Sequence, residues 1–318
     1  MSNIKLYLIV GQLYLPNIDI NAKWSQNGKT VAGGNGPGSA INQLHYPWDL
    51  YVDDDQTIYV AEYSNQRIME WNCGAMSGQV VAGGNKQGNR TNQLNGPANV
   101  IIDKENDSVI ICDQGNRRVV RWPRRNGKSG ETIISEIDCW GLTIDSNGYL
   151  YVSDYKKHEV RRWCTGDTCG TVIAGGNGKG NRLDQLNCPA QIFVDQDYSL
   201  YVSDIGNHRL MKWIQGAKEG IVIAGDETEG NDLTQLSYPS GVAVDHLGAV
   251  YVVDSHKHLV MRWFKGATQG SIIIGGNGQG PEANQLNGPV GLSFDRQGNI
   301  YVADNLNHRI QKFHIDST

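Results

Sequence analysis

The chain has few of the residues that are typical of a helical or an α/β enzyme. It contains 5 Met and 4 Phe among 318 residues, against 39 Gly and 14 Tyr, and many turns joined to short strands have such a composition. No apolar run approaches the roughly 20 residues that a membrane span requires. Residues 6–15 are apolar but short, and we interpret them as a strand rather than as the remnant of a signal peptide. The net charge of −5 gives no overall attraction to nucleic acid or to an anionic membrane.

Cysteine is also sparse, and six cysteines leave the redox compartment open, with an extracellular location favoured over a cytoplasmic one. Cys164 and Cys169 flank a four-residue turn between two predicted strands, where the geometry allows a disulfide. Cys112 lies inside a strand pattern, so we expect a buried and unreactive thiol. No second pair of Cys or His lies at ligand spacing, so we expect neither a metal nor another cofactor.

The feature that the chain does have is an internal repeat of about 50 residues. Each copy contains a Pro that is followed six residues later by an Asp. The five full anchors are Pro47/Asp53, Pro97/Asp103, Pro189/Asp195, Pro239/Asp245 and Pro289/Asp295. A sixth copy has Cys139 in the proline position and ends at Asp145, so the successive anchors are 50, 42, 50, 50 and 50 residues apart.

Each repeat contains four short runs of β-branched and aromatic residues that are bounded by Gly, Asn and Asp, as strands are. The runs of the first full copy are WDLYVD, TIYVAE, RIMEW and QVVAGG. A four-stranded unit of this size cannot bury both of its faces alone, whereas radial stacking of the copies buries them. The sequence therefore predicts an all-β fold, a six-bladed β-propeller of four-stranded antiparallel blades.

The ends of the chain predict how the ring closes. The last copy supplies three strands and lacks the fourth, while an orphan fourth strand, residues 30–33, precedes the first anchor. Joining the two would complete the sixth blade. We therefore expect one domain over residues 1–318, in which residues 1–28 form an N-terminal extension that packs on the closing blade.

The turn between the second and third strands carries Asn207-His208-Arg209 in one copy and Asn307-His308-Arg309 in another. In this position the tripeptide resembles the one for which NHL repeats are named, and the resemblance recurs six times over nearly the whole chain. NHL propellers include lyases, RNA- or protein-binding tails of ubiquitin ligases, and sensor ectodomains. The resemblance therefore implies a fold without settling a function.

The same turn pairs an acidic residue with an Arg five positions later. The four pairs are Glu62–Arg67, Asp113–Arg118, Asp204–Arg209 and Asp304–Arg309. Such residues can form a bidentate ion pair across the turn, and their recurrence in blade after blade indicates a structural role. Glu159 and Leu259 replace the Arg in the third and fifth copies, where we expect looser turns.

The best candidate for a ligand site is the start of each first strand, because these strands line the channel of a propeller. Two residues after the anchor proline, the copies carry Asp49, Asn99, Gly141, Gln191, Gly241 and Gly291. One residue after it, two copies carry Trp48 and Trp140. Polar groups beside aromatic faces suit a small molecule or a glycan, so we expect these residues to form one rim of the channel. The short third copy lacks the Gly-rich loop before Trp140, which predicts a notch in that rim beside Trp140 and Asn99.

Three functions fit these observations. The favoured one is a monomeric, non-enzymatic propeller without catalytic residues, which recognises a protein, a glycan or a small molecule through its loop face and channel rim. The alternative is a metal-dependent hydrolase or lyase with its site in the central channel, at Asp49, Asn99 and Gln191. NHL lyases hold zinc through channel histidines, and the sequence contains no such set. A nucleic-acid-binding domain, or another binder of an anionic partner, would use the basic run Arg117, Arg118, Arg121, Arg124 and Arg125.

Overall fold

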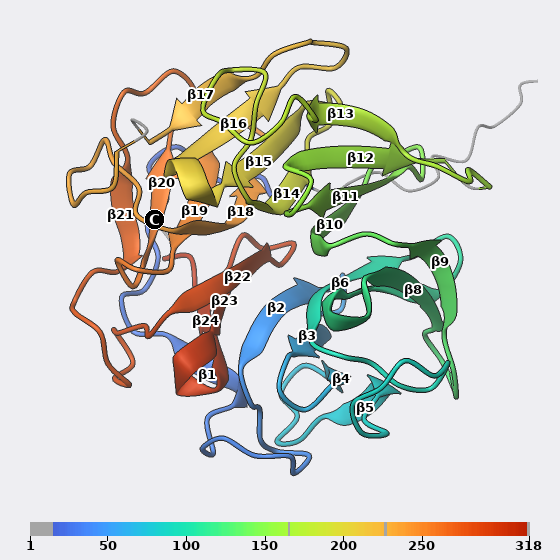
Figure 1. Cartoon of the computed structure of the whole chain (residues 1–318). Helices are drawn as coiled ribbons and strands as arrows, with labels where there is room; N and C mark the ends of the chain where they lie inside the picture. Colours follow the sequence, from blue (N-terminus) through green and yellow to red (C-terminus); the bar gives the residue numbers. More distant parts are fainter. Residues whose placement is uncertain (1–14, 165, 226–227, 317–318) are drawn as a thin grey trace, which may run out of the picture.

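A computed structural model describes residues 15–164, 166–225 and 228–316. These residues form six four-stranded antiparallel sheets arranged around a central axis (Figure 1). The predicted all-β, six-bladed propeller is therefore confirmed. The strand expected at residues 6–15 lies outside the described residues, apart from its last position. None of the helices in the described ranges is long and apolar enough to cross a membrane.

The first three blades follow one another along the chain. Blade one consists of β2 (Pro47–Val52), β3 (Ile58–Glu62), β4 (Arg67–Trp71) and β5 (Gln79–Gly83). Blade two consists of β6 (Pro97–Asp103), β7 (Ser108–Asp113), β8 (Arg118–Pro123) and β9 (Glu131–Ser135). Blade three consists of β10 (Cys139–Ile144), β11 (Leu150–Asp154), β12 (Glu159–Trp163) and β13 (Thr171–Gly175).

The remaining blades repeat this order, and the last one recruits the first strand of the chain. Blade four consists of β14 (Pro189–Val194), β15 (Leu200–Asp204), β16 (Arg209–Trp213) and β17 (Ile221–Ala224). Blade five consists of β18 (Pro239–Val244), β19 (Val250–Asp254), β20 (Leu259–Trp263) and β21 (Ser271–Gly275). Blade six consists of β22 (Pro289–Phe294), β23 (Ile300–Asp304), β24 (Arg309–Phe313) and β1 (Lys29–Gly33). Single 3-10 turns follow the second strand in alternate blades, as η1 (Gln114–Asn116), η2 (Ile205–Asn207) and η3 (Asn305–Asn307).

The hydrophobic core lies between neighbouring blades. Tyr59 and Ile68 of blade one, for example, pack against Val109 and Trp122 of blade two. An aromatic residue near the end of each third strand is buried in these layers. These residues are Trp71, Trp122, Trp163, Trp213, Trp263 and Phe313. Since aromatic side chains bury 150–250 Å² each, the repeated aromatic position accounts for much of the contact between blades.

The ring closes as the sequence predicts. β1 pairs antiparallel with β24, with Lys29 opposite Lys312 and Gly33 opposite Arg309. Before β1, Trp24 is 2% exposed, and its indole N–H donates to the carbonyl of Gly298 at 2.9 Å. The described part of the N-terminal extension therefore contacts the closing blade, while residues 1–14 lie outside the described residues.

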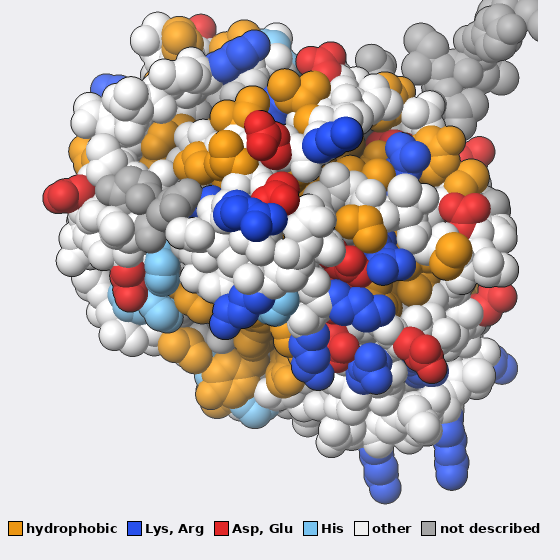
Figure 2. All heavy atoms as spheres, turned by 45° about the horizontal axis from the view of Figure 1, so that its top comes forward, with side chains coloured by type: hydrophobic (Ala, Val, Ile, Leu, Met, Phe, Trp, Pro, Cys, Tyr) orange, Lys and Arg blue, Asp and Glu red, His pale blue; other side chains and the backbone are white. Residues whose placement is uncertain are grey.

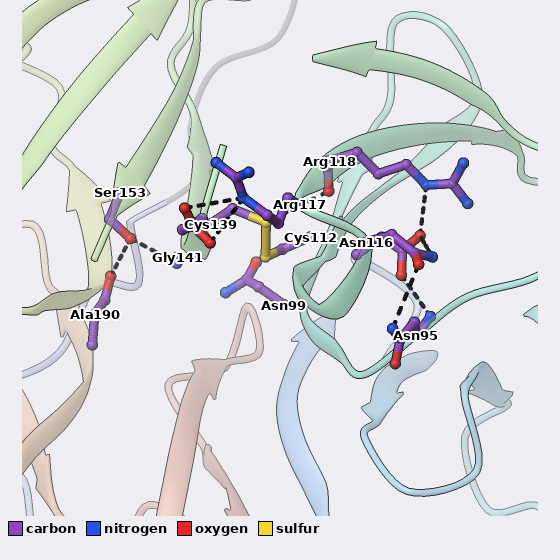
Figure 3. Close-up of a disulfide and its surroundings, with 12 residues drawn as sticks. Asn95, Asn99, Cys112, Asn116, Arg117, Arg118, Cys139, Gly141, Ser153 and Ala190 are labelled. Atoms are coloured by element: carbon purple, nitrogen blue, oxygen red, sulfur yellow. Dashed lines mark hydrogen bonds and ion pairs between the residues drawn. A yellow bond between two sulfur atoms is a disulfide. The ribbon is translucent and has the colours of Figure 1, made fainter. Parts of the chain in front are cut away.

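The disulfide of the structure is not the predicted one. Cys164 and Cys169 are exposed thiols without a disulfide. Instead, Cys112 on β7 is bonded to Cys139 at the start of β10, with their Cα atoms 5.9 Å apart (Figure 3). Both predictions, a disulfide at Cys164 and an unpaired thiol at Cys112, are therefore wrong. The partner of Cys112 lies 27 residues away in the adjacent blade, and spacing along one chain does not reveal which strands of two blades approach each other.

Candidate functional site

The arginines of the repeated turn clamp a loop as well as an acidic side chain. Arg309 Nε donates to Asp304 Oδ2 at 2.7 Å. Its terminal nitrogens donate to the backbone carbonyls of Pro281 at 2.7 Å, Glu282 at 3.0 Å and Gln285 at 3.1 Å. The predicted ion pair is present, but its geometry is not bidentate. The guanidinium joins the end of β23 to the Gly-rich loop that leads into the same blade.

This clamp recurs at the other three predicted pairs. The corresponding ion pairs are Glu62–Arg67, Asp113–Arg118 at 2.7 Å and Asp204–Arg209 at 2.8 Å. In each blade the arginine also donates to carbonyls of the preceding loop. We call these four acid–arginine pairs, with the loop carbonyls that they hold, the turn belt.

The asparagine of the NHL tripeptide completes the belt. Asn307 Nδ2 donates to Asp304 Oδ2 at 2.8 Å and to the carbonyl of Gly280 at 2.9 Å. The other oxygen of Asp304 accepts the backbone N–H of Asn287 at 2.7 Å. The carboxylate is thus hydrogen-bonded on both oxygens within the fold, which explains why the motif needs an amide and a guanidinium at this spacing.

The middle residue of the tripeptide links neighbouring blades. His308 has a left-handed backbone (φ 54°), and its Nδ1 accepts the backbone N–H of Tyr46, just before blade one, at 3.2 Å. His158 and His258 accept the equivalent N–H of the next blade, from Cys188 at 3.1 Å and Gly288 at 3.0 Å. These repeated histidines therefore hold the ring together. Among the described residues, no three His, Cys, Asp or Glu side chains converge as metal ligands.

The two blades without the arginine differ from the belt for different reasons. In blade five, Lys257 Nζ donates to the loop carbonyls of Asp232 at 3.3 Å and Gln235 at 2.9 Å, so a lysine takes over the loop contact. In blade three, only residues 136–138 connect β9 to β10, so there is no long loop to clamp. Here the Cys112–Cys139 disulfide joins the blades instead (Figure 3).

The basic run of blade two is matched by acidic residues. The pairs are Arg117–Asp138 at 3.2 Å, Arg118–Asp113 at 2.7 Å, Arg121–Asp103 at 3.8 Å, Arg124–Asp53 and Arg125–Asp107 at 3.6 Å. Figure 2 shows Lys and Arg side chains lying next to Asp and Glu side chains over the visible face. The run therefore carries much less net charge than its sequence suggests, and the pairing weakens the expectation of an anionic partner there.

A cavity of about 270 Å³ follows the channel axis between the first strands of the blades. Its inner end is formed by Asp49, Asn99 and Gln191, which we call the polar ring. Its walls come from the next residue of each first strand, namely Leu50, Val100, Leu142, Ile192, Val242 and Leu292. Exposed residues such as Lys104 and Glu105 line its outer end. The cavity thus opens on the face opposite the turn belt, with a polar bottom and aliphatic walls.

The five predicted site residues do not share one rim. Asp49, Asn99 and Gln191 are 6%, 2% and 5% exposed, which places them inside the channel rather than at its mouth. Trp48 and Trp140 do not line the cavity. Their ring centroids lie 5.9 Å apart on the belt side of the polar ring. The prediction of one common rim was wrong because Trp48 and Trp140 lie on the belt side of the polar ring, outside the cavity lining.

The notch expected beside Trp140 does not expose that residue or Asn99. Trp140 is 9% exposed, and its ring contacts those of Trp48 and Tyr155. Asp138 in the shortened loop forms ion pairs with Arg117 and with Lys156, at 3.2 and 3.0 Å. The two tryptophans therefore cover the polar ring from the belt side.

The polar ring contains hydrogen-bonding atoms that the fold does not use. Asn99 Nδ2 donates to Gln191 Oε1 at 2.7 Å. Asn99 Oδ1 and Gln191 Nε2, in contrast, have no hydrogen bond of normal geometry within the described ranges of the chain, although the Gln191 amide lies near enough to Asp49 to lower the pKa of that carboxyl group. Each such buried, unpaired group costs roughly 1–3 kcal/mol of stability.

The environment of Asp49 favours the neutral form of its carboxyl group. Burial raises its pKa to about 8, an effect that the backbone N–H of Leu50, the Gln191 amide and the backbone N–H of Val100 offset only in part. A β-carbon at Gly291 would collide with Asp49 Oδ1, so the glycine leaves the space that the carboxyl group occupies. The sequence indicated the polar ring, but it did not indicate the aliphatic walls or this role of Gly291; the apolar residue that follows each ring position was the available signal for the walls.

Comparisons with known proteins agree with this architecture. The family model described as NHL repeat matches residues 44–69, 236–262 and 286–313, which are turns and strands of blades one, five and six. The chain is an NHL-repeat β-propeller. A comparison of its sequence with curated proteins gives no significant match.

Several solved structures share the fold of this NHL propeller at low sequence identity. A protein of unknown function from Bacteroides thetaiotaomicron is 17% identical, with a TM-score of 0.72 over 92% of this chain and 77% of that one. An auxiliary nutrient binding protein from the same organism is 16% identical, with a TM-score of 0.68 over 97% and 76%. A virginiamycin B lyase from Staphylococcus aureus, solved with quinupristin, is 13% identical, with a TM-score of 0.56 over 88% and 99%.

Proposed function

We propose that this NHL propeller is a binding module that takes a small organic ligand into its channel cavity. The ligand would enter from the face opposite the turn belt, place its apolar part against the aliphatic walls and direct a polar group toward Asp49, Asn99 and Gln191. Mostly apolar walls with a few convergent polar groups are typical of small-molecule sites.

The observation that carries this proposal is the contrast in hydrogen bonding within one molecule. In the turn belt, Asp304 is hydrogen-bonded on both carboxylate oxygens. In the polar ring, Asn99 Oδ1 and Gln191 Nε2 are buried and unpaired among the described residues, and both side chains line the cavity. Because unpaired polar atoms destabilise the fold, a ligand that pairs with them gives a physical reason for their presence.

The similarity to known structures supports a binding role without naming a partner. One structural neighbour is named as an auxiliary nutrient binding protein, so the same propeller architecture occurs in a protein named for binding. Since folds host many functions, the proposal for this chain depends on its own cavity rather than on that name.

A binding screen tests the proposal. Ligand-observed NMR with pooled metabolites would compare the full chain with the double variant Asn99→Leu/Gln191→Met, which replaces both amides by apolar groups of similar size. Ser203→Ala is the matched control, because Ser203 Oγ is also buried and unpaired but does not line the cavity. We expect at least one ligand that the control retains and the double variant loses. Ligands that bind the double variant as well as the unchanged chain would refute a site in the channel.

A further inference from the structure

We infer that the ligand of the channel cavity presents an uncharged head group in which a hydrogen-bond donor lies beside an acceptor, as in a primary carboxamide on an apolar body. This inference rests on the proposed function and specifies the chemistry of that same site. It follows from the arrangement of two amides at the bottom of the cavity, from the charges around it, and from the composition of its walls.

The two side-chain amides fix the donor and acceptor count. Asn99 Nδ2 donates to Gln191 Oε1, and two atoms of the pair, the acceptor Asn99 Oδ1 and the donor Gln191 Nε2, have no hydrogen-bond partner among the described residues. If both amides were turned over, Gln191 would donate to Asn99, and one donor and one acceptor would again remain. A carboxamide matches this pair, because its carbonyl accepts and its NH₂ group donates.

The distribution of charge disfavours an ionised head group. Among the described residues that line the cavity, the positively charged ones are Lys104 and Arg296. Both belong to the mouth, where Asp54 forms ion pairs with each of them. A carboxylate at the polar ring would therefore be buried without a cation. An ammonium group would have to ionise Asp49, which burial disfavours.

The walls and the size of the cavity describe the rest of the ligand. The aliphatic residues above the polar ring, such as Leu50 and Ile192, offer contacts to an alkyl or aryl chain and no hydrogen bonds from their side chains. A volume of about 270 Å³ lies just below the range of roughly 300–1,000 Å³ for sites that hold drug-sized ligands. The ligand is therefore a compact molecule with one polar end.

A series of six-carbon probes tests the head group directly. Binding of hexanamide, 1-hexanol, hexanoate and hexylamine to the full chain would be measured by NMR titration at pH 7. We expect hexanamide to bind best, hexanol more weakly because one hydroxyl group must serve both free atoms, and the two charged probes at least about 10-fold more weakly than the amide. Asn99→Leu/Gln191→Met should lose hexanamide binding, and Ser203→Ala should not change it.

Other outcomes overturn the inference in distinguishable ways. If hexylamine bound best, and its affinity rose as the pH passed 8 and Asp49 ionised, the site would bind a cation. If hexanamide failed to bind while the metabolite screen found another ligand that the double variant loses, the head group would be wrong and the proposed function would stand. If no probe and no metabolite depended on Asn99 and Gln191, both the inference and the proposed function would fail.

Discussion

The turn belt and the polar ring are built from the same repeat, only a few residues apart along each blade, yet they treat their polar groups in opposite ways. In the belt, four of the six blades share one arrangement, in which carboxylate, guanidinium, amide and loop carbonyls bond one another. In the ring, the blades disagree, and two of the three polar side chains keep an unpaired buried atom. A position that carries the same residues in most blades, with every polar group hydrogen-bonded, is typical of a structural role. A position that varies between blades and keeps unpaired polar atoms indicates a site that lowers the stability of the fold.

The largest expected loss of stability comes from removing an arginine of the turn belt. Arg209→Met should lower the free energy of unfolding by about 3–5 kcal/mol, because it leaves Asp204 buried without its ion partner. Chemical denaturation would measure the loss, and hydrogen exchange should show the loop before β14 opening first. The control is Arg182→Met, which removes an exposed ion pair with Asp184 and should change stability by less than about 0.5 kcal/mol. Equal effects of the two variants would remove the distinction between belt and surface.

Blade three, where the belt is interrupted, gives the second test. Cys112→Ala/Cys139→Ala should cost about 3 kcal/mol, the value expected for a disulfide that closes a loop of this length. Unfolding in denaturant under oxidising conditions measures it. The exposed pair Cys164→Ser/Cys169→Ser serves as the control and should be nearly neutral. If both double variants unfolded like the unchanged chain, the disulfide would not take the place of the belt.

Substitution in the polar ring should raise the free energy of unfolding, whereas substitution in the turn belt lowers it. Asp49→Asn should stabilise the ligand-free protein by about 4 kcal/mol at pH 7, because the folded state keeps a proton on Asp49 up to a pKa of about 8, whereas the unfolded state releases it near 3.8. The stability of the unchanged chain therefore falls between pH 4 and pH 8 through this group. The advantage of the variant should be small at pH 4, grow up to pH 8 and then level off.

Unfolding experiments across that pH range would follow this difference. Asp316→Asn, at an exposed position, is the control and should show no such trend. A difference between Asp49→Asn and the unchanged chain that is independent of pH would mean that Asp49 is ionised in the folded protein.

The smallest expected change in stability gives the most direct test of the difference between the turn belt and the polar ring. Gln191→Met should change the free energy of unfolding by less than about 1 kcal/mol, since it removes one buried, unpaired donor and keeps the volume. It also deprives Asn99 Nδ2 of its acceptor, which limits the gain, and the double variant with Asn99→Leu should gain more. Thermal and denaturant unfolding of both variants would test this order. A clear loss of stability in the double variant would show that the ring, like the belt, is scaffold.

Much of the fold was predictable from the sequence because the same pattern of strands occurs in six copies. The spacing of anchors such as Pro47 and Asp53 defined the blades, and the orphan strand before Pro47 defined how the ring closes. The acid–arginine pairs were also predictable, since their two members lie five residues apart in one hairpin and need no knowledge of other blades.

Features that depend on contacts between blades were not predictable in the same way. The partner of Cys112 is in the next blade, and the carbonyls that Arg309 holds precede it by 24 to 28 residues. The candidate site was found only in part. Counting from the anchor selected Asp49, Asn99 and Gln191 correctly as neighbours, but it could not tell that Trp48 and Trp140 turn to the other side.

The pairing of β1 with β24 has a consequence for how the protein is made. Lys29 and Lys312 lie opposite each other, so β1 can form its ladder only after β24 has been synthesised. At translation rates of about 5–20 residues per second, the roughly 280 residues between them take about 14 to 56 seconds to synthesise. During that time β1 has an unpaired edge, which can pair with strands of other chains. The ring therefore closes only after β24 has been synthesised, and a chain truncated before β24 leaves β1 without its partner strand.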